Sequence, residues 1–183
     1  MAASARTRYD ADVGVIRYAT LGDETELVDV ARTAYEASFG ELWSPLALAS
    51  FLARQFSTEQ VRWDLRRGVA RYLVAERGGE LAGFARIHPD RPVTGLEGER
   101  GLHVQQLYLR PKSTGQGVGS ALLDAAAAVA EARGEERIWL EVPRSAIAAI
   151  RLYERHELVR RIELPWGTDE REIGMWVMTR LLR

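Results

Sequence analysis

The stretch LYLRPKSTGQGVGSALL, residues 107–123, joins an apolar run to an alanine-rich run through three glycines at alternate positions. The apolar run before Pro111 is typical of a strand, and the run from Val118 to Arg133, which Gly134 ends, is typical of a helix. A helix start exposes unpaired N–H groups and the positive end of the helix dipole. Because glycines let the backbone approach a ligand closely, the stretch predicts a strand-to-helix turn that binds a pyrophosphate.

Two well-known phosphate motifs do not match these glycines. A P-loop needs G-x-x-x-x-G-K-[ST], but Lys112, the chain's lysine, precedes the glycines. A dinucleotide fingerprint needs G-x-G-x-x-G, and counting from Gly115 puts Ser120 at the third glycine position. A structural turn with incidental glycines therefore stays open on the motif alone.

Length and composition limit the classes of protein that the chain fits. A chain of 183 residues suits one domain, and we expect a loose N-terminus over 1–12 and a single domain over 13–183. A formal net charge of −1 argues against nucleic-acid binding. No apolar run of about 18 residues and no signal-peptide pattern is present, so we expect no membrane association and a cytoplasmic location. The absence of cysteine excludes disulfides, thiolate metal sites and a cysteine nucleophile.

Helix caps and hairpin signals give the order of the predicted elements. Asp23 and Glu26 have the spacing of a capping box, while Ser44 and Ser57 are candidate caps of two further helices, the second ending at Gly68. The period then changes from 3.6 to 2, which predicts strands at 70–76, 81–88, 102–109, 137–142, 158–164 and 172–182, besides a first strand at 14–19. The sequence therefore predicts an α/β fold with a mixed central sheet of about seven strands flanked by helices.

Residues 107–123, followed by IWLEVPRSAIAAIRLYERHEL at 138–158, resemble the GNAT superfamily of acetyl-CoA-dependent N-acetyltransferases. That family carries Arg/Gln-x-x-Gly-x-Gly/Ala where a helix follows a strand, and then a strand and helix with a pattern like LEV and LYE. The resemblance covers nearly the whole chain. It implies the GNAT acyl-CoA N-acyltransferase fold, with acetyl-CoA as co-substrate and no metal.

The resemblance also implies which backbone groups bind acetyl-CoA. The sequence departs from the family pattern in three places. Thr114 stands where the family usually has Arg or Gln, and Ala146 stands where the family frequently has Asn. Glu157-Leu158 replaces the family's Gly-Phe. The pantetheine arm would pair with the main chain of two β-strand residues like a partial extra strand. The residues implied in cofactor binding are Leu107 and Leu109 on the strand and Gln116, Gly117, Val118, Gly119 and Ser120 on the turn.

Three residues are candidates for proton transfer. Tyr153 occupies the tyrosine of the LYE pattern, and a tyrosine with a pKa near 10 stays protonated at pH 7 and can donate to a departing thiolate. Glu141 matches the base of the ribosomal-protein acetylating branch, although it could equally face solvent. His103 is a second candidate base, since its ordinary pKa is near 6.5. A packing tyrosine and a structural histidine are the alternative interpretations.

The resemblance implies that the acceptor contacts the first two helices and the loop between the last two strands. Aromatic and acidic side chains there would suit a cationic amine, and residues 44–60 are similar to the polyamine-acetylating branch. Aromatics at helical spacing also pack in cores, which is the alternative. The candidate substrate residues are Tyr35, Glu36, Trp43 and Trp166, with Phe39, Asp169 and Glu170 in the same two regions.

Three functions follow as hypotheses. The first is an N-acetyltransferase that moves acetyl directly from acetyl-CoA to a primary amine of a polyamine-like small molecule or a peptide, in a ternary complex. The second is a non-catalytic acyl-CoA-binding sensor or interaction module of the same fold. The third is a Rossmann-like nucleotide-binding protein with Glu141 on a ribose hydroxyl. The C-terminal strands are a candidate homodimer surface.

Overall fold

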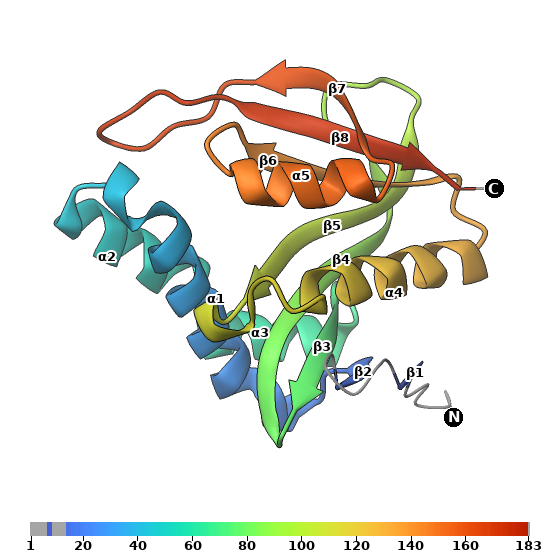
Figure 1. Ribbon diagram of the computed structural model, residues 1–183, viewed down its shortest axis with the longest axis horizontal. Coiled ribbons are helices and arrows are strands. Elements are labelled where there is room, and N and C mark those ends of the chain that lie inside the picture. Colours follow the sequence, from blue (N-terminus) through green and yellow to red (C-terminus); the bar gives the residue numbers. More distant parts are fainter. Residues whose placement is uncertain (1–6, 9–13, 183) are drawn as a thin grey trace.

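The computed structural model describes residues 7–8 and 14–182 (Figure 1). Within them one sheet has the order β1-β2-β3-β4-β5-β6-β8-β7. The sheet thus has seven strands of four residues or more, besides the two-residue β1, which confirms the predicted mixed α/β architecture. The strands are β1 (Thr7–Arg8), β2 (Val15–Tyr18), β3 (Arg71–Arg77), β4 (Glu80–Pro92), β5 (Arg100–Leu109), β6 (Arg137–Pro143), β7 (Val159–Leu164) and β8 (Met175–Leu181).

Helices cover both faces of the sheet. In chain order the helical elements are η1 (Leu21–Asp23), α1 (Glu24–Phe39), η2 (Gly40–Leu42), α2 (Pro45–Gln55), α3 (Thr58–Arg67), η3 (Pro111–Ser113), α4 (Val118–Ala132) and α5 (Ile147–Arg155). Thr7–Arg8 form a strand inside the segment expected to be loose, and the rest of 1–12 lies outside the described residues.

The sheet opens between β5 and β6, its parallel pair. Their register pairs Leu102 with Ile138 and His103 with Trp139. Beyond these pairs β5 continues to Leu109 and β6 to Pro143 without a common ladder. The other strand pairs are antiparallel. The two strands therefore separate toward the start of α4, and the gap connects the two faces of the sheet.

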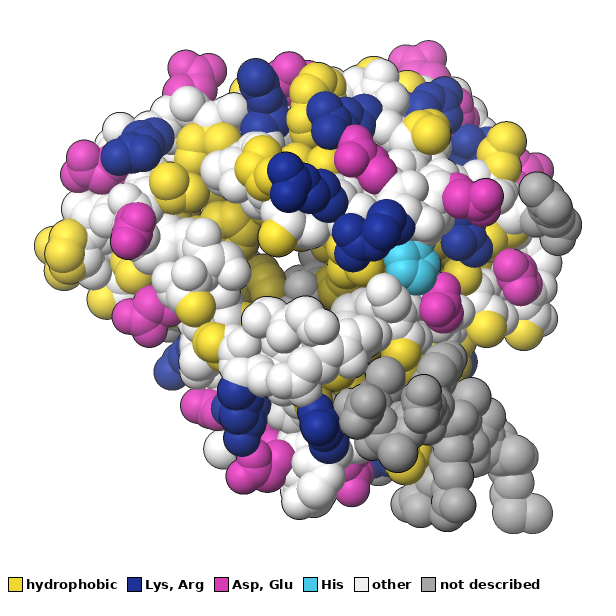
Figure 2. Space-filling model, viewed as in Figure 1, with side chains coloured by type: hydrophobic (Ala, Val, Ile, Leu, Met, Phe, Trp, Pro, Cys, Tyr) yellow, Lys and Arg dark blue, Asp and Glu magenta, His cyan; other side chains and the backbone are white. Residues whose placement is uncertain are grey.

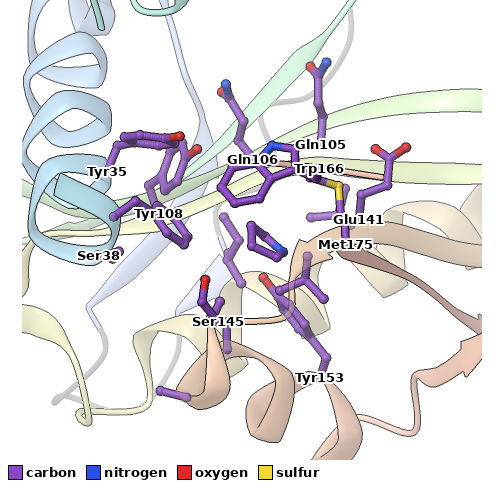
Figure 3. Close-up of a pocket in the computed structure, with 18 of the residues that line it drawn as sticks. Tyr35, Ser38, Gln105, Gln106, Tyr108, Glu141, Ser145, Tyr153, Trp166 and Met175 are labelled. Atoms are coloured by element: carbon purple, nitrogen blue, oxygen red, sulfur yellow. The ribbon is translucent and has the colours of Figure 1, made fainter. Parts of the chain in front are cut away.

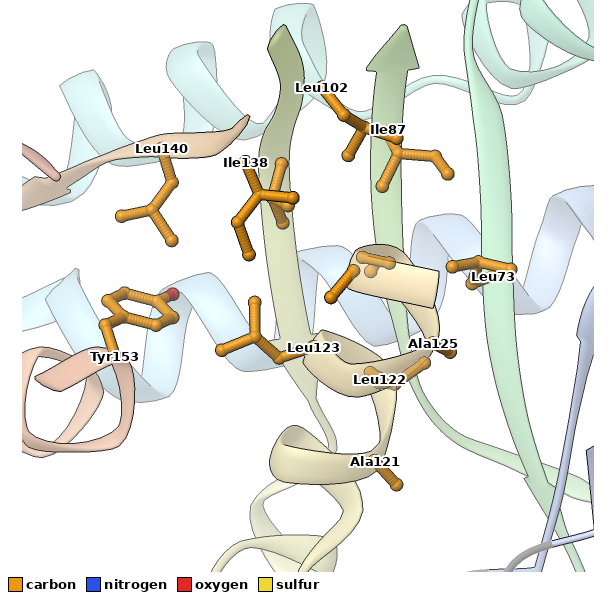
Figure 4. Close-up of a cluster of buried hydrophobic side chains, with 14 of the residues drawn as sticks. Leu73, Ile87, Leu102, Ala121, Leu122, Leu123, Ala125, Ile138, Leu140 and Tyr153 are labelled. Atoms are coloured by element: carbon orange, nitrogen blue, oxygen red, sulfur yellow. The ribbon is translucent and has the colours of Figure 1, made fainter. Parts of the chain in front are cut away.

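Each face of the sheet has its own hydrophobic core. On one face α4 packs Leu122 and Leu123 against Leu102 and Ile138, all fully buried (Figure 4). The repeated alanines of α4 keep that helix close to the strands, since their side chains are small. On the other face α1 and α3 pack against residues such as Phe84. Two cores hold the elements around the opening in fixed positions.

Most of the local signals are confirmed. The Ser57 hydroxyl accepts a hydrogen bond from the Gln60 N–H at 3.2 Å, and Gly68 ends α3 with a left-handed φ of 64°. The β3–β4 hairpin turns through Gly78 and Gly79, whose φ values of 60° and 83° fit a turn with two left-handed residues. These devices depend on neighbours in sequence, which explains why the sequence predicts them.

The capping box predicted at Asp23 and Glu26 is wrong. The Asp23 carboxylate accepts hydrogen bonds from Arg17 on β2 at 2.8 and 2.9 Å and from the Thr20 N–H at 2.7 Å. Glu26 accepts from the Leu81 N–H at 2.6 Å instead. The partly buried Arg17 needs a carboxylate, so tertiary contacts take both side chains away from the cap.

Candidate active site

The turn at residues 114–120 presents free backbone donors at the start of α4. Gly117 caps the helix with a φ of 80°, and Gly115 also has a left-handed φ, of 75°. The first helical hydrogen bond runs from the Ala121 N–H to the Gly117 carbonyl at 3.0 Å. The preceding N–H groups of α4 have no helical partner and lie at the positive end of its dipole. This backbone fits a pyrophosphate.

The end of β5 presents a second set of backbone groups. The Arg110 N–H donates to the Ala82 carbonyl of β4 at 2.9 Å. Because bonded and non-bonded pairs alternate along an antiparallel ladder, Leu107 and Leu109 direct their N–H and C=O groups away from β4. On that side β6 has already separated from β5. An extended arm of a ligand could pair there, as the family resemblance implies.

These two sets of backbone groups border one groove of about 510 Å³. The exposed Arg151 and Arg155 of α5 line the opposite side, which gives the groove a basic edge suited to phosphate groups. Thr114 also lines it, and its hydroxyl donates to the Pro111 carbonyl at 2.8 Å. Thr114 departs from the family pattern, but its hydroxyl stabilises the turn.

The other two departures lie at the ends of α5. Ala146 is the N-cap residue and provides no side-chain cap to the helix. Glu157 follows α5 with a φ of 63°, the conformation for which glycine is the usual residue.

A larger cavity of about 640 Å³ adjoins the groove. The cavity and the groove share lining residues, among them Leu107, Tyr108 and Tyr153, so they meet in the opening between β5 and β6. Figure 2 shows the molecule hollowed near the centre of this face, with hydrophobic side chains lining the hollow. The groove and the cavity together could place two molecules end to end.

Tyr153 lies where the groove and the cavity meet. Its side chain is buried in the core formed with α4, and its hydroxyl points into the cavity (Figure 3). Burial raises the pKa of this hydroxyl well above its usual value of about 10. Tyr153 therefore stays protonated over the whole neutral range and can act as a proton donor to a group in the opening.

Glu141 on β6 lines the same cavity and is half-buried. Its carboxylate accepts a hydrogen bond from the Thr94 hydroxyl at 2.7 Å and lies 3.3 Å from the His103 Nε2. Burial alone would raise the pKa of Glu141, but the interactions with His103 and Thr94 outweigh it and hold this pKa below its usual value. Glu141 is thus an ionised carboxylate that accepts protons weakly.

His103 does not line the cavity. Its ring stacks on Trp139 with a centroid distance of 3.8 Å and an interplanar angle of 6°. The Nε2 atom is buried, and although it lies 3.3 Å from Glu141, it is not aligned for a hydrogen bond. His103 therefore contacts the candidate base from behind and does not itself face the opening.

The candidate acceptor residues divide into two sets. Tyr35 and Trp166 line the cavity, as does Phe39. Trp43 packs behind Phe51, at a centroid distance of 4.8 Å, and is not among the lining residues. Glu36 is exposed and also does not line the cavity.

The loop between β7 and β8 closes one end of the cavity. The Asp169 carboxylate accepts hydrogen bonds from the Ser44 hydroxyl and N–H, and the Thr168 hydroxyl donates to the Leu42 carbonyl. Trp166 lies edge-on to Phe39 with the ring centroids 6.2 Å apart. These contacts fix the loop against the corner between α1 and α2, and they occupy Asp169.

Sequence reasoning missed several residues of the cavity wall. Tyr108 alternates with Leu107 and Leu109 along β5, so the strand period could have placed it on the acceptor face. Gln105 and Gln106 lie on the same strand, whereas the other missed residues lie on α2, directly after it and on β4, and carry no local signal. The missed lining residues include Phe51, Gln55, Phe56, Arg86, Gln105, Gln106 and Tyr108.

Among the described residues, no group of three or more His, Cys, Asp or Glu side chains is placed to hold a metal ion. In the same part of the chain no helix combines the length and the apolar character that crossing a membrane requires.

Comparison with known proteins agrees with this geometry. The family model of the acetyltransferase (GNAT) family matches residues 25–157. The mycothiol acetyltransferase of Thermobispora bispora is 35% identical over 124 residues, which cover 62% of this chain and 41% of that protein. This chain thus spans less than half of that relative.

Solved structures have the same fold. The PaiA N-acetyltransferase of Thermoplasma acidophilum in complex with coenzyme A has a TM-score of 0.71 at 20% identity, covering 91% of this chain and 98% of that chain. YncA of Salmonella typhimurium with its cofactor acetyl-CoA has a TM-score of 0.65 at 20% identity, covering 92% and 93%. With the matched family model and the groove at α4, these findings lead to one conclusion: this chain belongs to the GNAT family of acetyl-CoA-dependent acetyltransferases.

Proposed function

We propose that this protein transfers the acetyl group directly from acetyl-CoA to a primary amine while both are bound, with Tyr153 as general acid. The observation that carries the proposal is the position of Tyr153, which lines both the groove and the cavity. The thioester would reach the opening along β5 from the groove, and the amine from the cavity. No cysteine is present to form an acyl-enzyme, which also favours direct transfer.

The proton steps follow from the environments of two side chains. The amine nitrogen forms a bond with the thioester carbonyl carbon, and the carbon–sulfur bond breaks. Tyr153 donates its proton to the departing thiolate and regains one from solvent. Glu141, directly or through water, receives the proton that the amine loses. The hydrogen bond from Thr94 orients Glu141, and His103 contacts it from behind, so we assign His103 a positioning role.

The cofactor contacts follow the same proposal. The backbone of 116–120 would bind the pyrophosphate, and the main chain of Leu107 and Leu109 would pair with the pantetheine arm. Tyr35 and Trp166 would contact the acceptor. A polyamine-like acceptor receives less support, because Glu36, Asp169 and Glu170 are not among the residues that line the cavity. The homodimer and the cytoplasmic location stay predictions.

The test is free-thiol release from acetyl-CoA in the presence of amines, with initial velocities measured over both substrate concentrations. We expect amine-dependent release and intersecting double-reciprocal lines, as a ternary complex requires. Parallel lines would indicate an acyl-enzyme and contradict direct transfer. If acetyl-CoA binds but no amine of any class drives release, the non-catalytic acyl-CoA-binding module is the better description.

A further inference from the structure

Arg86 lies on β4 in the wall of the acceptor cavity. A guanidinium nitrogen lies 2.6 Å from the Asp64 carboxylate, which is fully buried. The Asp64 carboxylate also accepts hydrogen bonds from the Tyr72 hydroxyl at 2.7 Å and from the Gln60 side chain at 3.0 Å. These bonds fix Asp64, and Asp64 fixes the guanidinium. Arg86 is thus a rigid donor at the cavity, with its charge largely compensated from behind.

Two donors of the cavity wall are buried without a hydrogen-bond partner among the residues that the structure describes. They are the Arg86 Nε and the Tyr35 hydroxyl. An unpaired buried donor costs about 1–3 kcal/mol, so such groups are rare unless a ligand or water completes them. Both groups are donors to an oxygen. A ligand that brings a carbonyl or carboxylate oxygen to this wall would satisfy them.

The charged residues of the cavity wall favour the same kind of ligand. Arg86 and Glu141 are the charged residues among those that line it, and they come from different strands. Glu141 lies on β6, which borders the opening, whereas Arg86 neighbours Gln106 across the β4–β5 ladder. An amine that carries its own oxygen group fits this pair, because the oxygen can accept a hydrogen bond from Arg86, whereas a polycation offers Arg86 no acceptor.

The remaining wall is aromatic. Tyr35 contacts Phe51 at a centroid distance of 4.7 Å and Tyr108 at 6.5 Å, and Figure 3 shows both tyrosines on the wall opposite Glu141. Phe39, Phe56 and Trp166 complete this surface. A cavity with such a wall favours an acceptor with an aromatic or large apolar side chain.

The weakness of Glu141 as a base restricts which class of amine the protein can acetylate. At pH 7 an α-amine with a pKa near 7.8 costs about 1 kcal/mol to deprotonate, whereas an alkylamine near 10.4 costs about 4.6 kcal/mol. Glu141 has a lowered pKa and therefore gives little help. An α-amine needs less help, which agrees with the geometric argument from Arg86.

Resting on the proposed acetyl transfer, we propose that the acceptor is an α-amino acid derivative with an aromatic or apolar side chain, whose carbonyl or carboxylate oxygen binds to Arg86 and Tyr35. The α-amine would then reach the opening at Tyr153, and the side chain would contact the aromatic wall. Arg86 is in this account a residue that determines acceptor specificity.

The experiment compares kcat/KM for four acceptors: phenylalaninamide, phenylalanine, phenethylamine and spermidine. Phenethylamine has the same ring and amine as phenylalaninamide but no carbonyl. Each acceptor is assayed with wild type and with Arg86→Lys, which keeps a cation beside Asp64. The amine's own pKa cancels when variant and wild type are compared at one pH. We expect Arg86→Lys to lower kcat/KM about 10-fold more for phenylalaninamide than for phenethylamine, the size of one hydrogen bond to a charged donor.

Two further variants secure the result. Tyr35→Phe removes only the unpaired hydroxyl, so it tests the same preference even if Arg86→Lys folds poorly. Arg91→Lys is the matched control, because Arg91 is exposed on the same strand and does not line the cavity. Phenylalanine against its amide distinguishes a carboxylate from a neutral carbonyl, and either as preferred acceptor supports the proposal.

Two outcomes would overturn the proposal, and they differ from a failure of the proposed function. Equal losses of kcat/KM for phenylalaninamide and phenethylamine in both variants would show that the oxygen is not recognised. Spermidine as the best acceptor would contradict the charge argument. If the wild type releases no thiol with any amine, acetyl transfer itself is refuted and the inference falls with it.

Discussion

The groove at the start of α4 and the larger cavity meet at Tyr153, but they are built from different parts of the chain. The groove consists largely of backbone groups from residues 107–120, one continuous strand and turn, with two arginines from α5. The cavity consists of side chains from α1, α2, β4, β5, β6, α5, β8 and the loop before it. One site is local in sequence and the other is assembled by the fold.

This difference explains how such a fold could keep one cofactor and vary its acceptor. Backbone N–H groups survive most substitutions, so Thr114 and Ala146 can depart from the family pattern while the groove keeps its donors. A wall of side chains changes with each substitution. We therefore expect substitutions in the cavity to alter turnover and specificity, and substitutions in the groove to alter acetyl-CoA binding alone.

The largest effect is expected at the junction. Tyr153→Phe removes the proton donor for the departing thiolate, and we expect kcat to fall by about 10²–10⁴ with the acetyl-CoA dissociation constant nearly unchanged. Thiol release and isothermal calorimetry measure the two quantities. An unchanged kcat would show that Tyr153 only packs α5 against the sheet.

A smaller effect, with a defined pH dependence, is expected at Glu141. Because its pKa is lowered, Glu141 is ionised at every pH above its usual value, so the rise of kcat/KM between pH 6 and 9 reports deprotonation of the amine. Glu141→Gln should lower kcat for an α-amine acceptor by about tenfold at most, since unassisted deprotonation costs about 1 kcal/mol. The midpoint of the pH profile should stay in place. A shift of the midpoint in Glu141→Gln would show that the rise of kcat/KM reports the ionisation of Glu141.

A glycine of the groove has a matched control at the other end of α4. Gly115 and Gly134 have φ values of 75° and 72°, and an added Cβ would meet no heavy atom within 4 Å at either position. Alanine at each should lower the free energy of unfolding by about 1–2 kcal/mol, because a left-handed φ is unfavourable for alanine. Gly115→Ala alone should also weaken acetyl-CoA binding, by about fivefold, because strain in the turn would misplace one of the N–H donors of residues 116–120. Equal acetyl-CoA affinities in the two variants would exclude Gly115 from the binding site.

The smallest effect is expected at the basic edge of the groove. Arg151→Gln and Arg155→Gln should each raise the acetyl-CoA dissociation constant by about two- to threefold, because exposed ion pairs contribute about 0.2–1 kcal/mol. High salt should remove the difference by screening. Arg91→Gln, outside the groove, is the control. Losses that persist at high salt would indicate a role in shape and not in charge.

The sequence by itself determined the α/β fold, the order of its strands and helices, and the place of the groove at the start of α4. Each of these depends on near neighbours: the hydrophobic period, the caps at Ser57 and Gly68, the Gly78-Gly79 turn and the glycines before Val118. The family resemblance added Tyr153 and Glu141, both of which line the cavity.

Only the tertiary structure decided which side chains line the cavity. Arg86, Asp64 and Tyr35 come from three elements, and no spacing in the sequence relates them. The same is true of Asp23 and Glu26, which contact β2 and β4 and do not form the cap that their spacing predicts. A backbone conformation is set by adjacent residues, whereas a buried charge takes the partner that the folded chain brings within reach.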